Sequence, residues 1–191
     1  PETEHLVEAV LTKVNSGSSD KTTEELKILD IGTGSGAIAI TLATLLSTSR
    51  VSAVDISSSA IETAKKNAQL HLGTDRVSFY HGDGFNPIHQ NDKFDVIVSN
   101  PPYIKRSDRP TLMPEVSHYE PELALYSGEH GLTMIEYLVK NVATYLTSDG
   151  FFAFEFGYDQ RDEVNTIAKH YFADVEIIED FAGHPRVAVV W

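Results

Sequence analysis

The chain has 191 residues, 41% of them hydrophobic, and a formal net charge of −13 from 15 basic and 28 acidic residues. This length fits one domain, and because there is no cysteine, disulfides, thiolate metal sites and a cysteine nucleophile are excluded. The acidic balance has the wrong sign for a protein that depends on contacts with a nucleic-acid backbone. The sequence shows neither a membrane-spanning run nor a signal peptide, which predicts a soluble, cytoplasmic protein.

Strand-like and helix-like patterns alternate from Lys27 onward, which predicts an α/β domain with a largely parallel sheet. We expect strands at 27–31, 51–55, 77–80, 94–98 and 151–156, with helices between them. Ser59 and Glu62 form a Ser-x-x-Glu capping box that predicts the start of one helix. A later helix is predicted from apolar residues on one face, and a turn at 148–150 follows it; these residues are Ile135, Leu138, Val139, Val142 and Leu146.

The last two apolar runs, 175–178 and 187–190, have no helix between them. Gly183, His184 and Pro185 lie in the short segment that separates them. Such runs are expected to pair as an antiparallel hairpin. The sequence therefore predicts seven strands, with an antiparallel ending.

A glycine-rich turn, Gly32-Thr33-Gly34-Ser35-Gly36-Ala37, joins the first strand to the first helix. Close backbone approach and N–H donation from the helix N-terminus predict a nucleoside site there. Asp55, at the end of the second strand, is placed to bind ribose hydroxyls. The same spacing occurs in NAD enzymes, and a structural turn with a capping Asp is a further alternative. After the third strand, Asp83 is expected to accept from an adenine amine, and the ring of Phe85 lies against the base or fills the core.

The run Ser99-Asn100-Pro101-Pro102-Tyr103 follows the strand at 94–98. The Asn100 side-chain oxygen and the Pro101 carbonyl are two acceptors that suit the two hydrogens of a planar NH2 group. Together with the glycine turn, they indicate a methyl donor meeting a planar nitrogen at the carboxyl edge of the strands. We expect positioning to supply most of the catalysis, with Tyr103 packed against the acceptor. The alternative is a rigid turn that ends the strand.

Residues 104–130 show no clean periodicity, and loops of this length are usually functional or disordered. Three basic residues near the start of this segment face the substrate or are simply solvated: Lys105, Arg106 and Arg109. The eight histidines have no metal-ligand spacing, and no metal is expected. Those interpreted as loop residues are His118, His130 and His184.

These segments resemble the S-adenosylmethionine-dependent methyltransferases. Within them the chain is similar to the protein-(glutamine-N5) methyltransferases of the HemK/PrmC type, which modify peptide chain release factors. Residues 30–37 are similar to the family's cofactor loop, and residues 100–104 to its catalytic motif. Residues 1–4 resemble its Arg-Pro-Glu-Thr-Glu segment with the arginine missing. Two later stretches also resemble the family: Tyr119-Glu120-Pro121 with the residues after it, and Asp180 through Arg186.

The resemblance implies a Rossmann-like class I methyltransferase fold, with a seven-stranded, mostly parallel sheet and an antiparallel C-terminal hairpin. It implies one catalytic domain over 1–191, without the family's N-terminal helical substrate-binding domain, and a monomer. The expected reaction moves a methyl group from S-adenosylmethionine to the glutamine N5 of a release factor's Gly-Gly-Gln loop, leaving S-adenosylhomocysteine. The catalytic residues are Asn100, Pro101 and Tyr103, and the same three residues together with Pro102 bind the substrate. The cofactor-binding residues are Thr3, Gly32, Thr33, Gly34, Asp55, Ile56, Asp83, Gly84, Phe85 and Asn100.

Several alternatives stay open at this point. Thr3 and Glu4 lie near the cofactor by resemblance, or cap the start of a helix. An amino-methyltransferase acting on another protein or on adenine N6 of nucleic acid would use the same chemistry. An NAD-dependent oxidoreductase and a non-catalytic nucleoside-binding module are two further readings.

Overall fold

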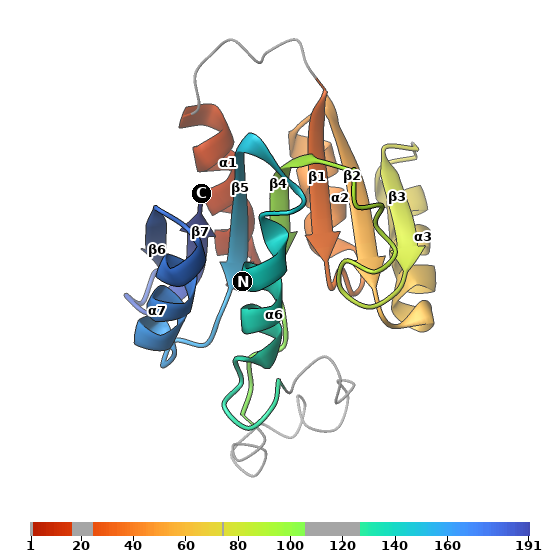
Figure 1. Cartoon of the computed structure of the whole chain (residues 1–191). Coiled ribbons are helices and arrows are strands. Elements are labelled where there is room, and N and C mark those ends of the chain that lie inside the picture. Colours follow the sequence, from red (N-terminus) through yellow and green to blue (C-terminus); the bar gives the residue numbers. More distant parts are fainter. Residues whose placement is uncertain (1, 17–24, 74, 106–126) are drawn as a thin grey trace.

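The computed structural model describes residues 2–16, 25–73, 75–105 and 127–191 (Figure 1). Its centre is a seven-stranded sheet in the order β3-β2-β1-β4-β5-β7-β6. Neighbours among β1 to β5 pair in parallel, and β7 is antiparallel to both β5 and β6. The predicted mostly parallel sheet with an antiparallel hairpin is confirmed. The strands are β1 Leu26–Ile31, β2 Ser49–Asp55, β3 Val77–His81, β4 Phe94–Ser99, β5 Leu146–Glu155, β6 Val175–Glu179 and β7 Pro185–Val190.

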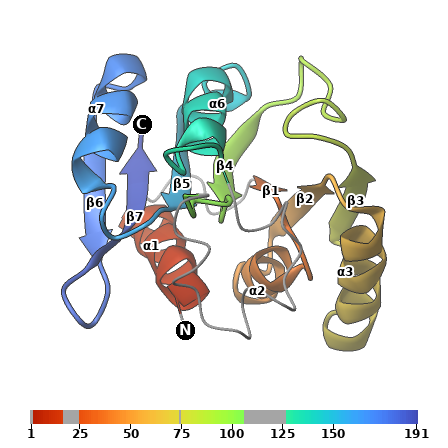
Figure 2. The ribbon, with the colours of Figure 1, turned by 90° about the horizontal axis from the view of Figure 1, so that it is seen from below.

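Helices cover both faces of the sheet (Figure 2). One face carries α1 Glu2–Ser16, α2 Ala37–Leu45 and α3 Ser58–His71, and the other carries α6 Thr133–Val142 and α7 Arg161–Tyr171. A strand covered on both faces must be apolar on both, which explains the unbroken buried run Val96, Ile97 and Val98 in β4. Within the described ranges, no helix has the length and apolar character needed to cross a bilayer.

Each face of the sheet has its own hydrophobic core. Alternate side chains of β5 point to opposite faces, so Phe152 and Phe154 pack with α6 and α7, whereas Phe151 packs on the α1 and α2 side. Leu6 and Val10 of α1 are completely buried in this second core. A helix that starts near Thr3 and Glu4 is one of the two alternatives given above, and α1 begins at Glu2. Its buried residues Leu6, Val7, Ala9 and Val10 follow helical spacing.

The predicted capping box at Ser59 and Glu62 is wrong. Ser57 is the N-cap of α3, and its hydroxyl accepts a hydrogen bond from the Ala60 N–H at 3.3 Å. The Asp55 carboxylate accepts from the Ser57 N–H at 2.8 Å, so the chain turns into the helix directly after β2. A contact between the end of the strand and the next residues therefore selects the earlier serine.

The boundary between α6 and β5 also differs from the prediction. Leu146 begins β5 instead of extending the apolar face of α6, because α6 ends at Val142. Residues 148–150, predicted as a turn, lie within β5 at the place where its register with β4 shifts between Phe94 and Val96. The turn-forming residues thus mark an irregularity inside a strand.

Candidate active site

The carboxyl ends of β1 to β5 share one edge of the sheet, because these strands run parallel; this edge is at the bottom of Figure 1 and faces the viewer in Figure 2. The glycine turn follows β1, Asp55 ends β2 and Asn100 follows β4. The buried Ser99 hydroxyl donates to the Ile31 carbonyl at 2.7 Å and joins the ends of β4 and β1. The predicted glycine turn and Asn100 therefore directly follow adjacent strands.

The glycines of the turn have two different roles. Gly32, Gly34 and Gly36 all have positive φ, at 75°, 56° and 84°. A Cβ on Gly36 would lie 3.0 Å from the Ala64 Cβ, so this glycine allows α2 and α3 to pack closely. A Cβ on Gly32 or Gly34 would meet nothing within 4 Å. These two backbone positions are open to an approaching ligand.

Asp55 holds the turn in shape. Its Oδ2 accepts from the Gly34 N–H and its Oδ1 from the Ser57 N–H, both at 2.8 Å. The local capping role is thus present, but a carboxylate has about four acceptor positions, so sites for ribose hydroxyls remain. The next residue, Ile56, is 50% exposed and offers an apolar surface beside this carboxylate.

Asp30 lies beneath the turn and is fully buried. The Thr33 hydroxyl donates to its Oδ2 at 2.7 Å. Burial raises the pKa of Asp30 to about 7, against the smaller opposing effect of the Thr33 hydrogen bond. Sequence reasoning assigned Asp30 no role of its own; an acidic residue inside an apolar strand, just before a glycine turn, is the signal that would have found it.

The residues after β3 are divided between surface and core. Asp83 is exposed, and its predicted contact with an adenine amine stays a prediction. Phe85 is 3% exposed and stacks on Tyr145 with ring centroids 4.4 Å apart, which favours the core alternative for its ring. A Cβ on Gly84 would lie 2.5 Å from the Tyr137 ring, so packing against α6 already accounts for this glycine.

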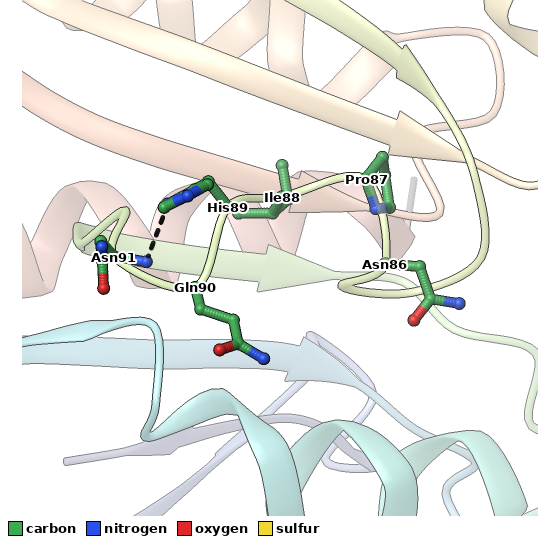
Figure 3. A pocket seen from close by; sticks show the side chains of 6 residues that line it. All are labelled: Asn86, Pro87, Ile88, His89, Gln90 and Asn91. Carbon is green, nitrogen blue, oxygen red and sulfur yellow. Dashed lines mark hydrogen bonds between the residues drawn. The ribbon is translucent and has the colours of Figure 1, made fainter.

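A pocket lies further along the same loop (Figure 3). It is lined by six consecutive residues from Asn86 to Asn91, none of them a predicted site residue. Within it, the Asn91 N–H and the His89 ring nitrogen are hydrogen bonded at 3.2 Å. The pocket is lined by residues of the β3–β4 loop alone.

The segment after β4 is held by residues that sequence reasoning missed. The Tyr103 hydroxyl donates a hydrogen bond to Glu155 Oε1 at 3.1 Å. The backbone carbonyl of Tyr103 accepts a hydrogen bond from Gln160 Nε2 at 3.1 Å. Glu155 and Gln160 are 1% and 2% exposed. Asn100 is half-buried, and its side chain makes no hydrogen bond to another residue in the described part of the chain. The Asn100 amide oxygen is therefore available to a ligand.

Other predicted residues have different surroundings. Lys105 forms an ion pair with Asp159 at 2.6 Å. Thr3 is in α1, but its side chain lies outside the described part of the structure. The predicted residues Arg106, Arg109, His118 and Tyr119-Glu120-Pro121 lie entirely outside the described part of the structure. Across the described ranges, no group of three or more His, Cys, Asp or Glu residues is placed to hold a metal ion.

The stretch from Asp180 to Arg186 builds the β6–β7 turn. Asp180 Oδ1 accepts from the Ala182 and His184 N–H groups at 2.9 Å, and its Oδ2 accepts from Arg186 Nε at 3.2 Å. The hydrogen bond from the His184 backbone is the main cause that lowers the pKa of Asp180. Gly183, with φ at 82°, completes the turn. These residues stabilise the hairpin.

The strand order, the glycine turn after β1 and the acid at the end of β2 together define a class I methyltransferase fold. Residues 22–171 match the family model described as a methyltransferase domain, and the chain belongs to that family.

Curated relatives resemble nearly the whole chain. It is 42% identical over 190 residues to a release factor glutamine methyltransferase from Bacillus cereus, and 41% identical over 191 residues to one from Neisseria gonorrhoeae. The alignments cover 98% and 99% of this chain but 65% and 66% of those relatives. The chain thus spans just under two thirds of their length. Human methyltransferase-like protein 13, solved in complex with SAH, superposes with a TM-score of 0.65 at 17% identity, covering 96% of this chain and 80% of that one. That likeness supports the fold alone.

Proposed function

We propose that residues 1–191 form a single catalytic domain that uses S-adenosylmethionine to methylate a glutamine side chain of a peptide chain release factor. The observation that carries this proposal is the open amide oxygen of Asn100, which lies next to Pro101 and directly after β4, the neighbour of the strand that leads into the glycine turn. The names of the relatives from Bacillus cereus and Neisseria gonorrhoeae support a release factor as the substrate. The Gly-Gly-Gln loop of that factor is the proposed target.

The residues at the strand edge fit such a cofactor. The open positions at Gly32 and Gly34 allow a ligand to approach the backbone, and Asp55 has acceptor positions left for ribose hydroxyls. The side chain of Ile56, which is 50% exposed, would pack against a base of the cofactor. When bound, the cofactor supplies a methyl group on a positively charged sulfur. Thr33, Asp83, Gly84 and Phe85 complete the proposed set after β1 and β3.

The protein's task is to orient a weak nucleophile. The lone pair of a glutamine amide is delocalised into its carbonyl, so the nitrogen attacks poorly. In the proposal, Asn100 Oδ1 and the Pro101 carbonyl each accept one N–H, which aligns the nitrogen for in-line attack. Bound S-adenosylmethionine would supply the methyl group to this nitrogen as its own C–S bond breaks, and the proton that the nitrogen loses would pass to water. Tyr103 and Pro102 would bound the acceptor side chain.

The test is transfer of labelled methyl from S-adenosylmethionine to a purified release factor. The assay compares the wild-type Gly-Gly-Gln loop with a Gln→Ala loop, and adds adenine-containing DNA and RNA as competing acceptors. Label that depends on the glutamine supports the proposal. Label on nucleic acid instead would overturn the substrate and favour an adenine-N6 enzyme. Binding of NADH without binding of S-adenosylmethionine, measured by calorimetry, would overturn the cofactor as well.

A further inference from the structure

Gln160 is a buried amide that joins three separate segments of the chain. It lies just before α7 and is 2% exposed. Its Oε1 accepts from the Gly157 N–H at 2.9 Å, and its Nε2 donates to the carbonyls of Tyr103 at 3.1 Å and His130 at 3.2 Å. One oxygen and both amide hydrogens are therefore used, which is what a buried amide needs in order to be satisfied.

The place where these bonds meet is closely packed. Gly131, with φ at 73°, follows one of the bonded carbonyls, and a Cβ there would overlap the Tyr103 carbonyl and the Gln160 amide. A second connection lies alongside, since the Ser127 N–H donates to the Ile104 carbonyl at 3.2 Å. The backbone leaving β4 and the backbone approaching α6 are thus held together by Gln160 and by their own hydrogen bond.

The backbone between Asn100 and Tyr103 transmits this constraint. Pro101 and Pro102 have φ fixed by their rings, and each also restricts the residue before it. The segment has few soft dihedral angles, so a displacement of the Tyr103 carbonyl moves Pro101 and Asn100 with it. Glu155, bonded to the hydroxyl of Tyr103, fixes the far end of that side chain.

We infer that Gln160 is a positioning residue for methyl transfer: its side-chain amide fixes the backbone of Tyr103, and through it the acceptor pair formed by Asn100 and the Pro101 carbonyl. This inference rests on the proposed function. Gln160 itself touches no reacting atom in this scheme. Only an amide provides two donors and one acceptor at this site, so both a carboxylate and an apolar side chain of similar length would fail to hold all three segments.

The test uses two variants and matched controls. Gln160→Met keeps the side-chain length but removes every hydrogen bond, and Gln160→Glu keeps the shape but places a carboxylate against two carbonyl oxygens. The same substitutions at Gln69, which is exposed on α3, are the controls. Hydrogen exchange of peptides covering 103–105 and 127–131 measures how firmly Gln160 holds these two segments, and it requires no substrate. Calorimetry with S-adenosylmethionine and the kcat for the release factor complete the measurements.

We expect exchange in these two segments to become at least tenfold faster in Gln160→Met, with the β1, β2 and β4 peptides unchanged. The kcat should fall roughly 10- to 100-fold, since a misplacement of about 1 Å can cost about 100-fold in rate. Cofactor affinity should stay within about threefold, because the glycine turn is on another element. Gln160→Glu should recover activity as the pH falls, because a protonated carboxyl regains one donor, whereas the loss in Gln160→Met should not change with pH.

Unchanged exchange together with unchanged kcat in both variants would overturn the inference. So would a loss of cofactor binding equal to the loss of kcat, since that pattern indicates general unfolding. If the wild-type chain transfers no methyl to the release factor, the proposed function fails. The exchange measurement still tests in that case whether Gln160 holds the two segments. A failure of the proposed function and a failure of this inference are therefore distinguishable.

Discussion

Replacement of Asp30 by Asn should change how the stability of this protein depends on pH. Asp30 is fully buried beneath the glycine turn, and burial raises the pKa of its carboxyl from 3.8 to about 7. A shift from 3.8 to about 7 makes ionisation in the folded state more costly by on the order of 4 kcal/mol, at about 1.4 kcal/mol for each pKa unit.

The sign of the effect follows from proton binding. The folded protein holds the Asp30 proton more tightly than the unfolded chain does, so the free energy of unfolding falls as the pH rises from about 4 to about 7. Above about 7 the cost is constant, because the group is ionised in both states. Asn cannot ionise and lacks this contribution. The free energy of unfolding of Asp30→Asn, relative to wild type, should rise by about 3 kcal/mol between pH 5 and pH 8.

Urea unfolding of the cofactor-free protein at half-unit pH intervals measures this difference. Asp92→Asn is the matched control, because Asp92 is exposed in the β3–β4 loop. Comparison with this variant separates the effect at the buried carboxyl from the effect of removing one negative charge at the surface. Parallel profiles for Asp30→Asn and wild type over the same range would refute the assignment of a raised pKa to Asp30.

Four further substitutions concern the strand edge. Gly36→Ala should lower the free energy of unfolding by about 2 kcal/mol, because left-handed backbone costs about 1–2 kcal/mol and a Cβ also crowds α3. Gly34→Ala should cost stability only about 1 kcal/mol yet weaken cofactor binding in calorimetry; equal effects of the two substitutions on binding would contradict the separate roles of these glycines. Ser99→Ala, which removes the buried bond between β4 and β1, should cost about 1–2 kcal/mol in urea unfolding, and a neutral result would show that this bond is not needed. Asn100→Ala should reduce methyl transfer by about 100- to 1000-fold with cofactor affinity retained, whereas Asn91→Ala, a surface control, should leave both unchanged; loss of binding together with activity would point to a folding role.

Signals that are local or periodic were sufficient to predict the architecture from the sequence. Apolar runs of strand length alternate with helical patterns, so the α/β sheet and the antiparallel β6–β7 hairpin are confirmed. The same reasoning predicted one site from residues far apart in sequence, because parallel strands place their carboxyl ends at one edge. Gly34 and Asp55, which are 21 residues apart, are in fact hydrogen bonded.

Only the tertiary structure decided which groups support that site. The Gln160 side chain donates a hydrogen bond to a carbonyl 57 residues away. Asp30 is buried by packing on both faces of the sheet, and the Phe85 ring stacks on the Tyr145 ring. The N-cap at Ser57 depends likewise on the Asp55 carboxylate at the end of β2. The contacts of Gln160, Asp30 and Phe85 form only when elements distant in the chain come together, so no local pattern predicts them. The Asp55–Ser57 bond spans only two residues, but the place where β2 ends selects it over the predicted box at Ser59. The order of residues along the chain thus predicts the fold and the edge of the sheet that holds the candidate site, and packing decides how the parts of that site are held.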